Sequence, residues 1–204
     1  MHEHDFYDDL AGALERSWRL LEEAIGDPTA PVRTPVLISI SAGGLAQGRT
    51  VVLRGFNRQQ RQLQIYTDVR SAKVAELRTQ PCCTLVAYQP NPMIQLRLNT
   101  NAIVNHNNEI TCEAWAFMPG PNRCNYLTDP DPGSISMKAT DGRPVINAAS
   151  VPTNDENETA YSHFSVIVFT INKLEWLYLP RRGHRRAQFI WDQVDSLQSN
   201  WLIP

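Results

Sequence analysis

Residues 49–73, RTVVLRGFNRQQRQLQIYTDVRSAK, decide the fold that we predict for this chain. Two runs rich in β-branched and aromatic residues, one from Arg49 and one from Gln62, lie on either side of a polar turn, which is the pattern of two paired strands. Ser71 follows as a typical N-cap, and the run up to Pro81 predicts a short helix. The pattern therefore predicts a sheet into which a short helix is inserted.

The same residues predict an anion-binding corner. If the two strands pair in antiparallel register, the start of the first lies beside the end of the second, so that Arg49 is close to Thr67. The helix begins at Ser71, and its free N–H groups and Lys73 then point toward the same place. A guanidinium, an ammonium and hydroxyls at a helix N-terminus are typical of a phosphate site. The ordinary alternative is a capped helix surrounded by solvated charges.

Further strand patterns continue on both sides of this stretch. They begin at Pro35, Cys82, Met93, Phe164 and Arg185. Strands near both ends of the chain that enclose a few helices predict a mainly β, α+β barrel with helical insertions. The length of 204 residues fits one domain, which we expect to span residues 1–204.

Helical patterns interrupt the predicted strands. Apolar residues at helical spacing predict an N-terminal helix over about 5–25, and a second helical pair is expected over 109–118 and 122–127. From Asp129 to Thr159 the sequence is rich in Pro, Gly, Asp, Asn and Ser, which predicts a long mobile loop. The helical insertion and this loop together occupy about 109–160.

Composition and charge exclude several classes of protein. Hydrophobic residues make up 42% of the chain and charged residues 20%, which excludes a disordered chain. Asp and Glu outnumber Lys and Arg by 21 to 19, whereas a general nucleic-acid binder needs a basic field. No long apolar run predicts a membrane span, and the first residues lack the pattern of a secretory signal, so we expect a cytoplasmic protein. The adjacent Cys82 and Cys83 lie in an apolar run that favours buried thiols over a metal site, and no metal is predicted.

Two other groups of residues are able to carry chemistry. Gln95 and Arg97 lie two residues apart, so they share one face of a strand and suit a flat heterocycle, unless the strand is simply half exposed. The pattern W-x5-R-x-H-x-R comprises Trp176, Arg182, His184 and Arg186. Its basic residues lie at a predicted turn in an acidic protein, which favours one bound anion over a polyanion. Trp176 is suited to cover an aromatic ring, although tryptophan in a strand is more often part of the core.

Taken in order, these motifs resemble the pyridoxamine 5'-phosphate oxidase family of FMN-binding split barrels. The resemblance rests on RTVVLRGF, YTDVRSAK, QLRL, W-x5-R-x-H-x-R and a Leu-Ile-Pro end, with a poor stretch between Glu109 and Tyr161. The segment WAFMPGPNRCNYL is more similar to the oxidase-related FMN-binding branch than to the vitamin enzyme. The resemblance implies a six-stranded antiparallel split β-barrel with peripheral helices and with FMN as cofactor.

The resemblance also implies roles for individual residues. The FMN-binding positions are Arg49, Thr50, Val51, Val52, Tyr66, Thr67, Ser71, Lys73 and Gln95, together with Trp176 and Arg186 from a second subunit. The substrate-binding positions are Arg54, Arg123, Arg182 and His184, of which Arg182 and His184 are also the catalytic candidates. The family arrangement places FMN across a homodimer interface, so that one subunit holds half a site.

Three departures from the family pattern affect the expected substrate more than the expected FMN binding. Ala72 replaces an arginine, Arg54 replaces a lysine, and only Arg123 stands for the family's substrate residues in the inserted helix. Three functions remain open. One is an FMN-dependent oxidase of pyridoxamine or pyridoxine 5'-phosphate, or of another small anionic amine or alcohol. The others are a flavin- or nicotinamide-dependent reductase and a non-catalytic module that binds flavin or haem.

Overall fold

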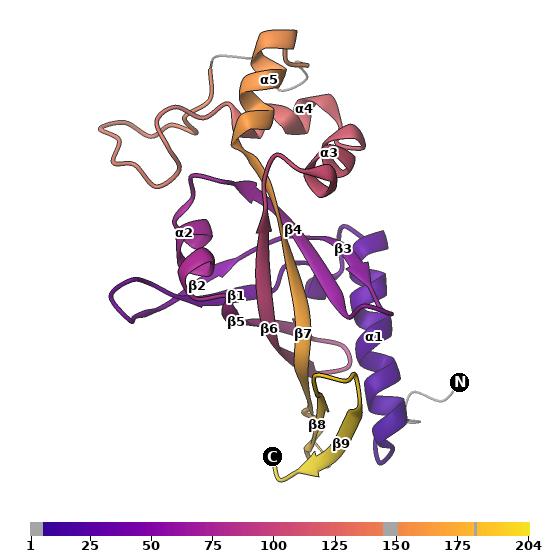
Figure 1. Cartoon of the computed structure of the whole chain (residues 1–204). Helices are drawn as coiled ribbons and strands as arrows, with labels where there is room; N and C mark the ends of the chain where they lie inside the picture. The colour runs from indigo at the N-terminus through magenta and orange to yellow at the C-terminus, as the bar shows by residue number, and fades with distance from the viewer. Residues whose placement is uncertain (1–5, 145–150, 182) are drawn as a thin grey trace.

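An antiparallel sheet forms the body of the protein in the computed structural model, which describes residues 6–144, 151–181 and 183–204 (Figure 1). The strands are β1 (Val36–Ile40), β2 (Ala46–Thr50), β3 (Leu53–Asn57), β4 (Gln62–Asp68), β5 (Cys82–Gln89), β6 (Ile94–Asn105), β7 (Phe164–Tyr178), β8 (Arg185–Trp191) and β9 (Leu197–Leu202). The helices are α1 (Leu10–Gly26), α2 (Ala72–Thr79), α3 (Glu109–Ala116), α4 (Gly120–Arg123) and α5 (Asn154–His163), with 3-10 turns at Pro31–Arg33 and Cys124–Tyr126. Among the described residues no helix is both long and apolar enough to span a membrane.

The order of the strands makes the sheet curl into a split barrel. The order is β2-β1-β5-β6-β7-β4-β3, so the two edge strands, β2 and β3, follow one another in the chain. Only Val51 and Val52 lie between them, and the three steps from Thr50 to Leu53 span at most about 11 Å. The two edges of the sheet must therefore lie close together. The long β7 contributes to this arrangement because its first half pairs with β4 and its second half with β8.

The structure corrects two predictions about the strands. The described residues contain nine strands, whereas six were expected. The run from Arg49 to Phe56 is not one strand: β2 pairs with β1, while β3 pairs with β4. The Val51 N–H donates to the carbonyl of Pro35 at 3.0 Å, and the chain changes pairing partner directly after it. A run of β-branched residues indicates a strand without indicating its partner, so the sequence did not show this break.

The helical predictions are confirmed in outline, with one correction. Helices α1, α2, α3 and α4 lie where helical patterns were expected. The predicted loop over 129–159 instead ends in α5, which begins after Thr153. The Thr153 hydroxyl accepts from the N–H of Glu156 and the Glu156 carboxylate accepts from the N–H of Thr153, so a capping box starts the helix. Residues 145–150 of the predicted loop lie outside the described residues.

Two clusters of buried side chains hold the fold together. The larger one fills the barrel, where Trp176, Phe169 and Phe189 are fully buried and α1 packs Trp18 against Phe56. The smaller one centres on Phe164, whose ring contacts Tyr66 of the barrel and the Trp115 and Tyr126 rings of the inserted segment. Phe164 therefore fixes the helical insertion to the end of the barrel.

The packing of Phe164 gives a first prediction. Phe164→Ala should lower the free energy of unfolding by about 3–5 kcal/mol, because it empties the centre of the smaller cluster. Phe117→Ala is the matched control, since Phe117 is 90% exposed and its loss should change stability by no more than about 0.5 kcal/mol. Denaturant unfolding measures both. Similar losses in the two variants would show that the insertion does not depend on Phe164.

Candidate functional site

A cationic corner lies where β4 leads into α2. The Lys73 ammonium donates to the hydroxyl of Thr67 at 2.9 Å and to the hydroxyl of Ser71 at 3.1 Å. The Ser71 hydroxyl donates its own proton to the carbonyl of Asp68 at 2.7 Å, so it does not cap α2. Burial, and next the positive charge of Arg49, lower the pKa of Lys73. Lys73, Thr67 and Ser71 thus meet as predicted.

Arg49 reaches this corner by a route that differs from the predicted one. It stands opposite Leu37 in the β1–β2 pair and not beside Thr67. Its guanidinium forms an ion pair of 2.8 Å with Glu76 of α2 and also contacts the Ser39 hydroxyl. Arg49 therefore approaches the helix from β2, and its charge acts on Lys73 through space.

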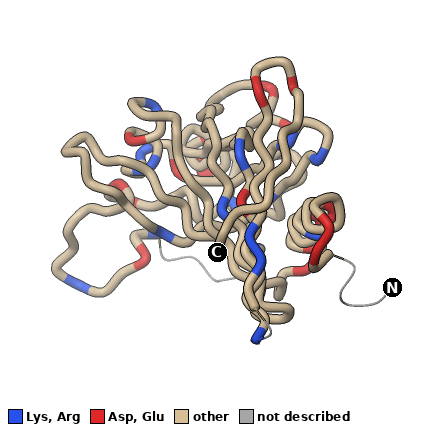
Figure 2. The backbone as a smooth tube through the Cα atoms, turned by 90° about the horizontal axis from the view of Figure 1, so that it is seen from below, with Lys and Arg blue, Asp and Glu red and all other residues tan. Residues whose placement is uncertain are grey.

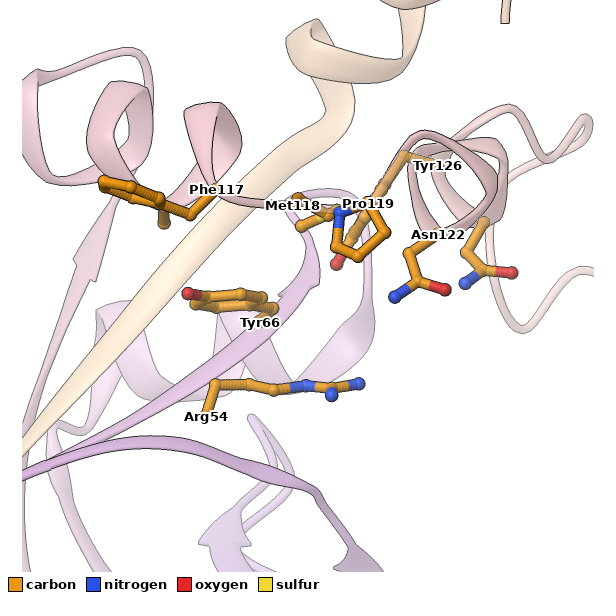
Figure 3. Close-up of a pocket in the computed structure, with 9 residues that line it drawn as sticks. Arg54, Tyr66, Phe117, Met118, Pro119, Asn122 and Tyr126 are labelled. Atoms are coloured by element: carbon orange, nitrogen blue, oxygen red, sulfur yellow. The ribbon is translucent and has the colours of Figure 1, made fainter. Parts of the chain in front are cut away.

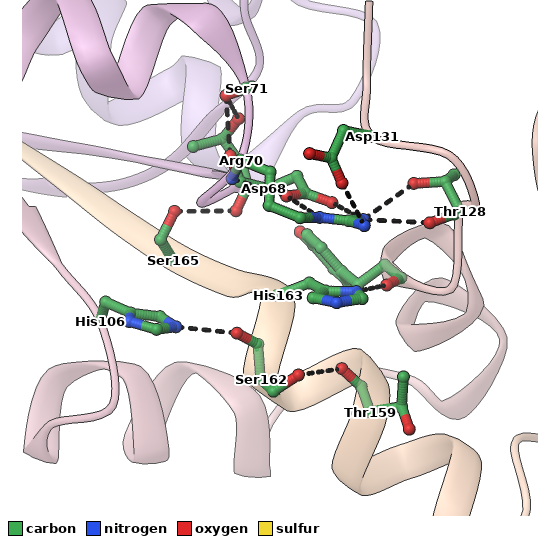
Figure 4. A network of polar contacts seen from close by, with 12 residues as sticks. Asp68, Arg70, Ser71, His106, Thr128, Asp131, Thr159, Ser162, His163 and Ser165 are labelled. Carbon is green, nitrogen blue, oxygen red and sulfur yellow. Dashed lines mark hydrogen bonds and ion pairs between the residues drawn. The ribbon is translucent and has the colours of Figure 1, made fainter. Parts of the chain in front are cut away.

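The two carboxylates whose charges act on Lys73, Asp68 and Glu76, are each paired with an arginine. Glu76 pairs with Arg49, and the contacts of Asp68 are drawn in Figure 4. Asp68 forms an ion pair of 2.6 Å with Arg70, which also pairs with Asp131 at 2.9 Å and donates to Thr128. Within the described residues, no carboxylate lies within ion-pair distance of the Lys73 ammonium. A partly buried ammonium that meets only neutral hydroxyls is an electrostatic site for an anion.

A pocket opens on the outer face of β3 and β4, the face opposite the larger buried cluster (Figure 3). Arg54 lies in a β-bulge, where the β3–β4 register shifts between Leu53 and Gly55. Bulges redirect side chains, and Arg54 extends beneath the ring of Tyr66. The volume of the pocket is about 120 Å³, and its other lining residues are Ala114, Phe117, Met118, Pro119, Asn122, Asn125 and Tyr126.

Sequence reasoning missed the polar residues that the insertion contributes to this pocket. Asn122, Asn125 and Tyr126 line it, and burial raises the pKa values of Tyr66 and Tyr126, so both phenols stay protonated donors at neutral pH. Asn122 and Asn125 are three residues apart in a predicted helical segment, which places them on one face. That spacing was the available signal.

Arg123, predicted to bind substrate, has a structural role instead. Its guanidinium donates to the carbonyls of Met118 at 3.2 Å and Trp115 at 2.9 Å and to the side chain of Asn157 at 3.1 Å. It also stacks on the Trp115 ring, with 5.1 Å to the ring centre. These contacts tie α4 to α3 and α5, and Arg123 is absent from the lining of the pocket.

The remaining predicted cofactor residues lie on two opposite faces of the sheet. Gln95 stands opposite Leu177, which stands opposite Arg186, so these side chains share the outer face. Arg49 shares the inner face with the buried residues Leu37 and Leu85. One copy of the chain therefore does not bring Gln95 and Arg186 to the cationic corner.

Residues 50–52, at the link between the two edge strands β2 and β3, differ in exposure. Thr50 is exposed on the outer face, opposite Val36, whereas Val51 is buried. Val52 is exposed at the link between β2 and β3. Of the predicted flavin-binding stretch, Thr50 and Val52 thus offer surface to a ligand.

Trp176 is not available to cover a flavin. It is fully buried against Phe6, Tyr178 and Trp201. It stands opposite Ala187, so it points to the face opposite Arg186, because neighbouring residues of a strand alternate. The predicted joint contact of these two side chains with one ring is therefore corrected.

The hairpin between β7 and β8 forms a second, open pocket of about 280 Å³. His184, Arg185, Arg186 and Trp201 line it, and Asp8 adds an ion pair of 2.7 Å with Arg185. The His184 side chain is exposed. Arg182, the other catalytic candidate, lies outside the described residues.

A buried carboxylate organises the outer face beside this hairpin. Glu175 is 6% exposed and contacts Lys173 at 2.8 Å, Arg186 at 2.7 Å and also Arg97. Burial alone raises the pKa of Glu175, but hydrogen bonds from Lys173 and Arg186, with the charge of Arg97, outweigh it and lower the pKa to about 2. Glu175 thereby fixes Arg186 on the outer face.

Comparison with known proteins finds a family match for residues 15–106. Residues 15–106 match the sequence model described as the pyridoxamine 5'-phosphate oxidase FMN-binding domain. A pyridoxine/pyridoxamine 5'-phosphate oxidase 2 of Arabidopsis thaliana is 38% identical over 63 residues, which cover 31% of this chain and 32% of the plant protein.

Solved structures show the same fold over nearly the whole chain. An oxidase-related FMN-binding protein of Nostoc punctiforme superposes with a TM-score of 0.71 at 20% identity, over 93% of this chain and 96% of that one. PhzG of Burkholderia lata, solved with tetrahydrophenazine-1-carboxylic acid, gives a TM-score of 0.70 at 14% identity, over 100% and 97% of the two chains. These likenesses confirm the split-barrel fold.

The Glu175 cluster predicts a pH dependence of stability. The folded-state pKa lies below the ordinary value of 4.5, so the stabilisation is complete above pH 4.5 and is lost as the pH falls through about 2. Between pH 6 and pH 2 the wild-type chain should lose about 3 kcal/mol more unfolding free energy than Glu175→Gln. Glu113→Gln, at an exposed position, should follow the wild-type curve. If the unfolding free energies of wild type and Glu175→Gln changed in parallel with pH, the lowered pKa of Glu175 would be contradicted.

Proposed function

We propose that the chain is an FMN-dependent oxidoreductase of a small anionic amine or alcohol, because residues 15–106 match the FMN-binding domain of the pyridoxamine 5'-phosphate oxidase family. The observation that carries this proposal is the partly buried Lys73 ammonium, held by two hydroxyls and by no carboxylate among the described residues. The family match supports FMN as the cofactor, and this corner would hold its phosphate.

The residues of the corner fit a flavin phosphate. The Lys73 ammonium and the hydroxyls of Thr67 and Ser71 are donors that suit a phosphate, and Arg49 adds positive charge. The Ser71 side chain does not cap α2, which leaves the first N–H groups of that helix without a side-chain acceptor. Ala72 removes one arginine of the family pattern, so phosphate binding at the corner would depend on Lys73 and on Arg49, which also pairs with Glu76.

Bound FMN would supply the redox chemistry by accepting a hydride from a substrate carbon. The protein would hold the substrate in the pocket on the outer face, at the same end of β4 as the corner, because Tyr66 lines the pocket and the next residue, Thr67, contacts Lys73 on the opposite face. Arg54 would bind the anionic group of the substrate, and the Tyr66 ring would limit its movement.

A homodimer would complete the site. Gln95 and Arg186 share the outer sheet face, whereas the corner lies on the other face, so a second copy has to supply them. Arg186, fixed by Glu175, would place a positive charge at the flavin ring, and the exposed His184 would hold or accept a proton of the substrate amine or alcohol.

The cofactor proposal predicts the behaviour of two variants. Lys73→Ala and Arg49→Ala should each weaken FMN binding about 10- to 150-fold, the cost of one charge-assisted hydrogen bond, and should lose the yellow colour on purification. Lys138→Ala and Arg78→Ala remove exposed charges elsewhere and should keep the colour. Retention of FMN by both corner variants would refute the placement of the phosphate.

The activity is tested by peroxide release without added nicotinamide. The FMN-loaded chain should release hydrogen peroxide from at least one small anionic alcohol, with pyridoxine 5'-phosphate and 4-(hydroxymethyl)benzoate as the first two substrates. Peroxide from neither, with oxidation of an added nicotinamide cofactor, would assign the chain as a reductase. A flavin that neither reaction reduces would assign it as a binding module.

A further inference from the structure

The pocket beneath the insertion carries an inference about the substrate. We infer that it binds the carboxylate of a single-ring aromatic molecule in preference to a phosphate ester. As a statement about the substrate, this rests on the proposed function, since it assumes that this pocket receives the reacting molecule. The pocket itself is defined by Arg54, Tyr66 and the inserted segment from Ala114 to Tyr126.

Arg54 gives the pocket lining one positive charge, which matches a ligand with a single negative charge. Arg54 makes no hydrogen bond or ion pair with any described residue, and no Asp, Glu or Lys lines the pocket. Arg143 reaches the mouth, where it donates to Asn125 at 3.3 Å, but Asp141 neutralises it at 2.7 Å. A carboxylate therefore leaves the pocket neutral, whereas a phosphate monoester dianion leaves one negative charge without a partner in the pocket.

The planar shape of the Arg54 guanidinium also favours a carboxylate over a phosphate. A guanidinium presents parallel N–H donors that match the two oxygens of a carboxylate, whereas an ammonium is a point charge. The bulge between Leu53 and Gly55 directs Arg54 out of the sheet, and the Tyr66 ring lies over its stem (Figure 3). The fork is thus held at the floor of the pocket.

The volume and lining limit the rest of the ligand. A cavity of about 150 Å³ holds benzene, so the pocket's 120 Å³ with an open mouth admits one six-membered ring and leaves further substituents outside. Tyr66, Phe117 and Tyr126 supply aromatic surface for that ring. The amides of Asn122 and Asn125 supply donors and acceptors for polar groups on the ring.

Benzoate and phenyl phosphate test this inference, because they share a ring and differ in the anionic group. In NMR titrations of the purified full chain with added FMN, benzoate should bind at least about tenfold more tightly than phenyl phosphate, a difference of 1.4 kcal/mol. Arg54→Lys, which keeps the charge and loses the fork, should weaken benzoate at least about tenfold. Arg78→Ala is the control and should leave both dissociation constants unchanged.

A second variant keeps the test decisive. Asn122→Asp adds a carboxylate to the pocket while Arg54 stays in place, and it should abolish benzoate binding. Tighter binding of phenyl phosphate, or benzoate binding that neither variant alters, would overturn the inference even where FMN is bound. Benzoate binding that needs Arg54 in a chain that takes up no FMN would instead support this pocket and refute the proposed function.

Discussion

In the part of the chain that the structure describes, the Lys73 ammonium is partly buried and has no carboxylate within ion-pair distance, and the proposed chemistry depends on that group. Lys73 donates to the hydroxyls of Thr67 and Ser71, while Arg70 holds Asp68 and is itself held by the segment around Thr128. Removing a positive charge from water without pairing it raises the free energy of the folded chain. An anion at this corner would recover part of that free energy, so charge and burial support the proposed phosphate site as well as the motif does.

The two-residue link between β2 and β3 determines where the other functional groups lie. It forces the edges of the sheet together, and it brings β2, with Arg49, to the side of the sheet that α2 covers. Alternation along the strands then sends Gln95 and Arg186 to the outer face. One chain therefore does not bring the corner and these outer-face residues together, which is the physical basis for the proposed homodimer.

The sequence predicted the elements better than their partners. Periodicity located the helices and most strands, and the residues around Ser71 indicated the corner because a helix start is a local signal. The partner of β2, the orientation of Trp176 and the role of Arg123 depend on contacts between distant segments, which one sequence does not display. Asn122 and its neighbours were missed because the insertion departs from the family pattern, and these residues line the pocket proposed for the substrate.

The most direct test of the central claim compares FMN with riboflavin, which lacks only the phosphate. Fluorescence titration gives both dissociation constants for the wild-type chain and for Lys73→Met. The wild type should prefer FMN by at least about tenfold, and Lys73→Met should remove most of this preference. Equal affinity of the wild type for the two flavins, or a preference for FMN that Lys73→Met retains in full, would refute the proposed phosphate site at Lys73.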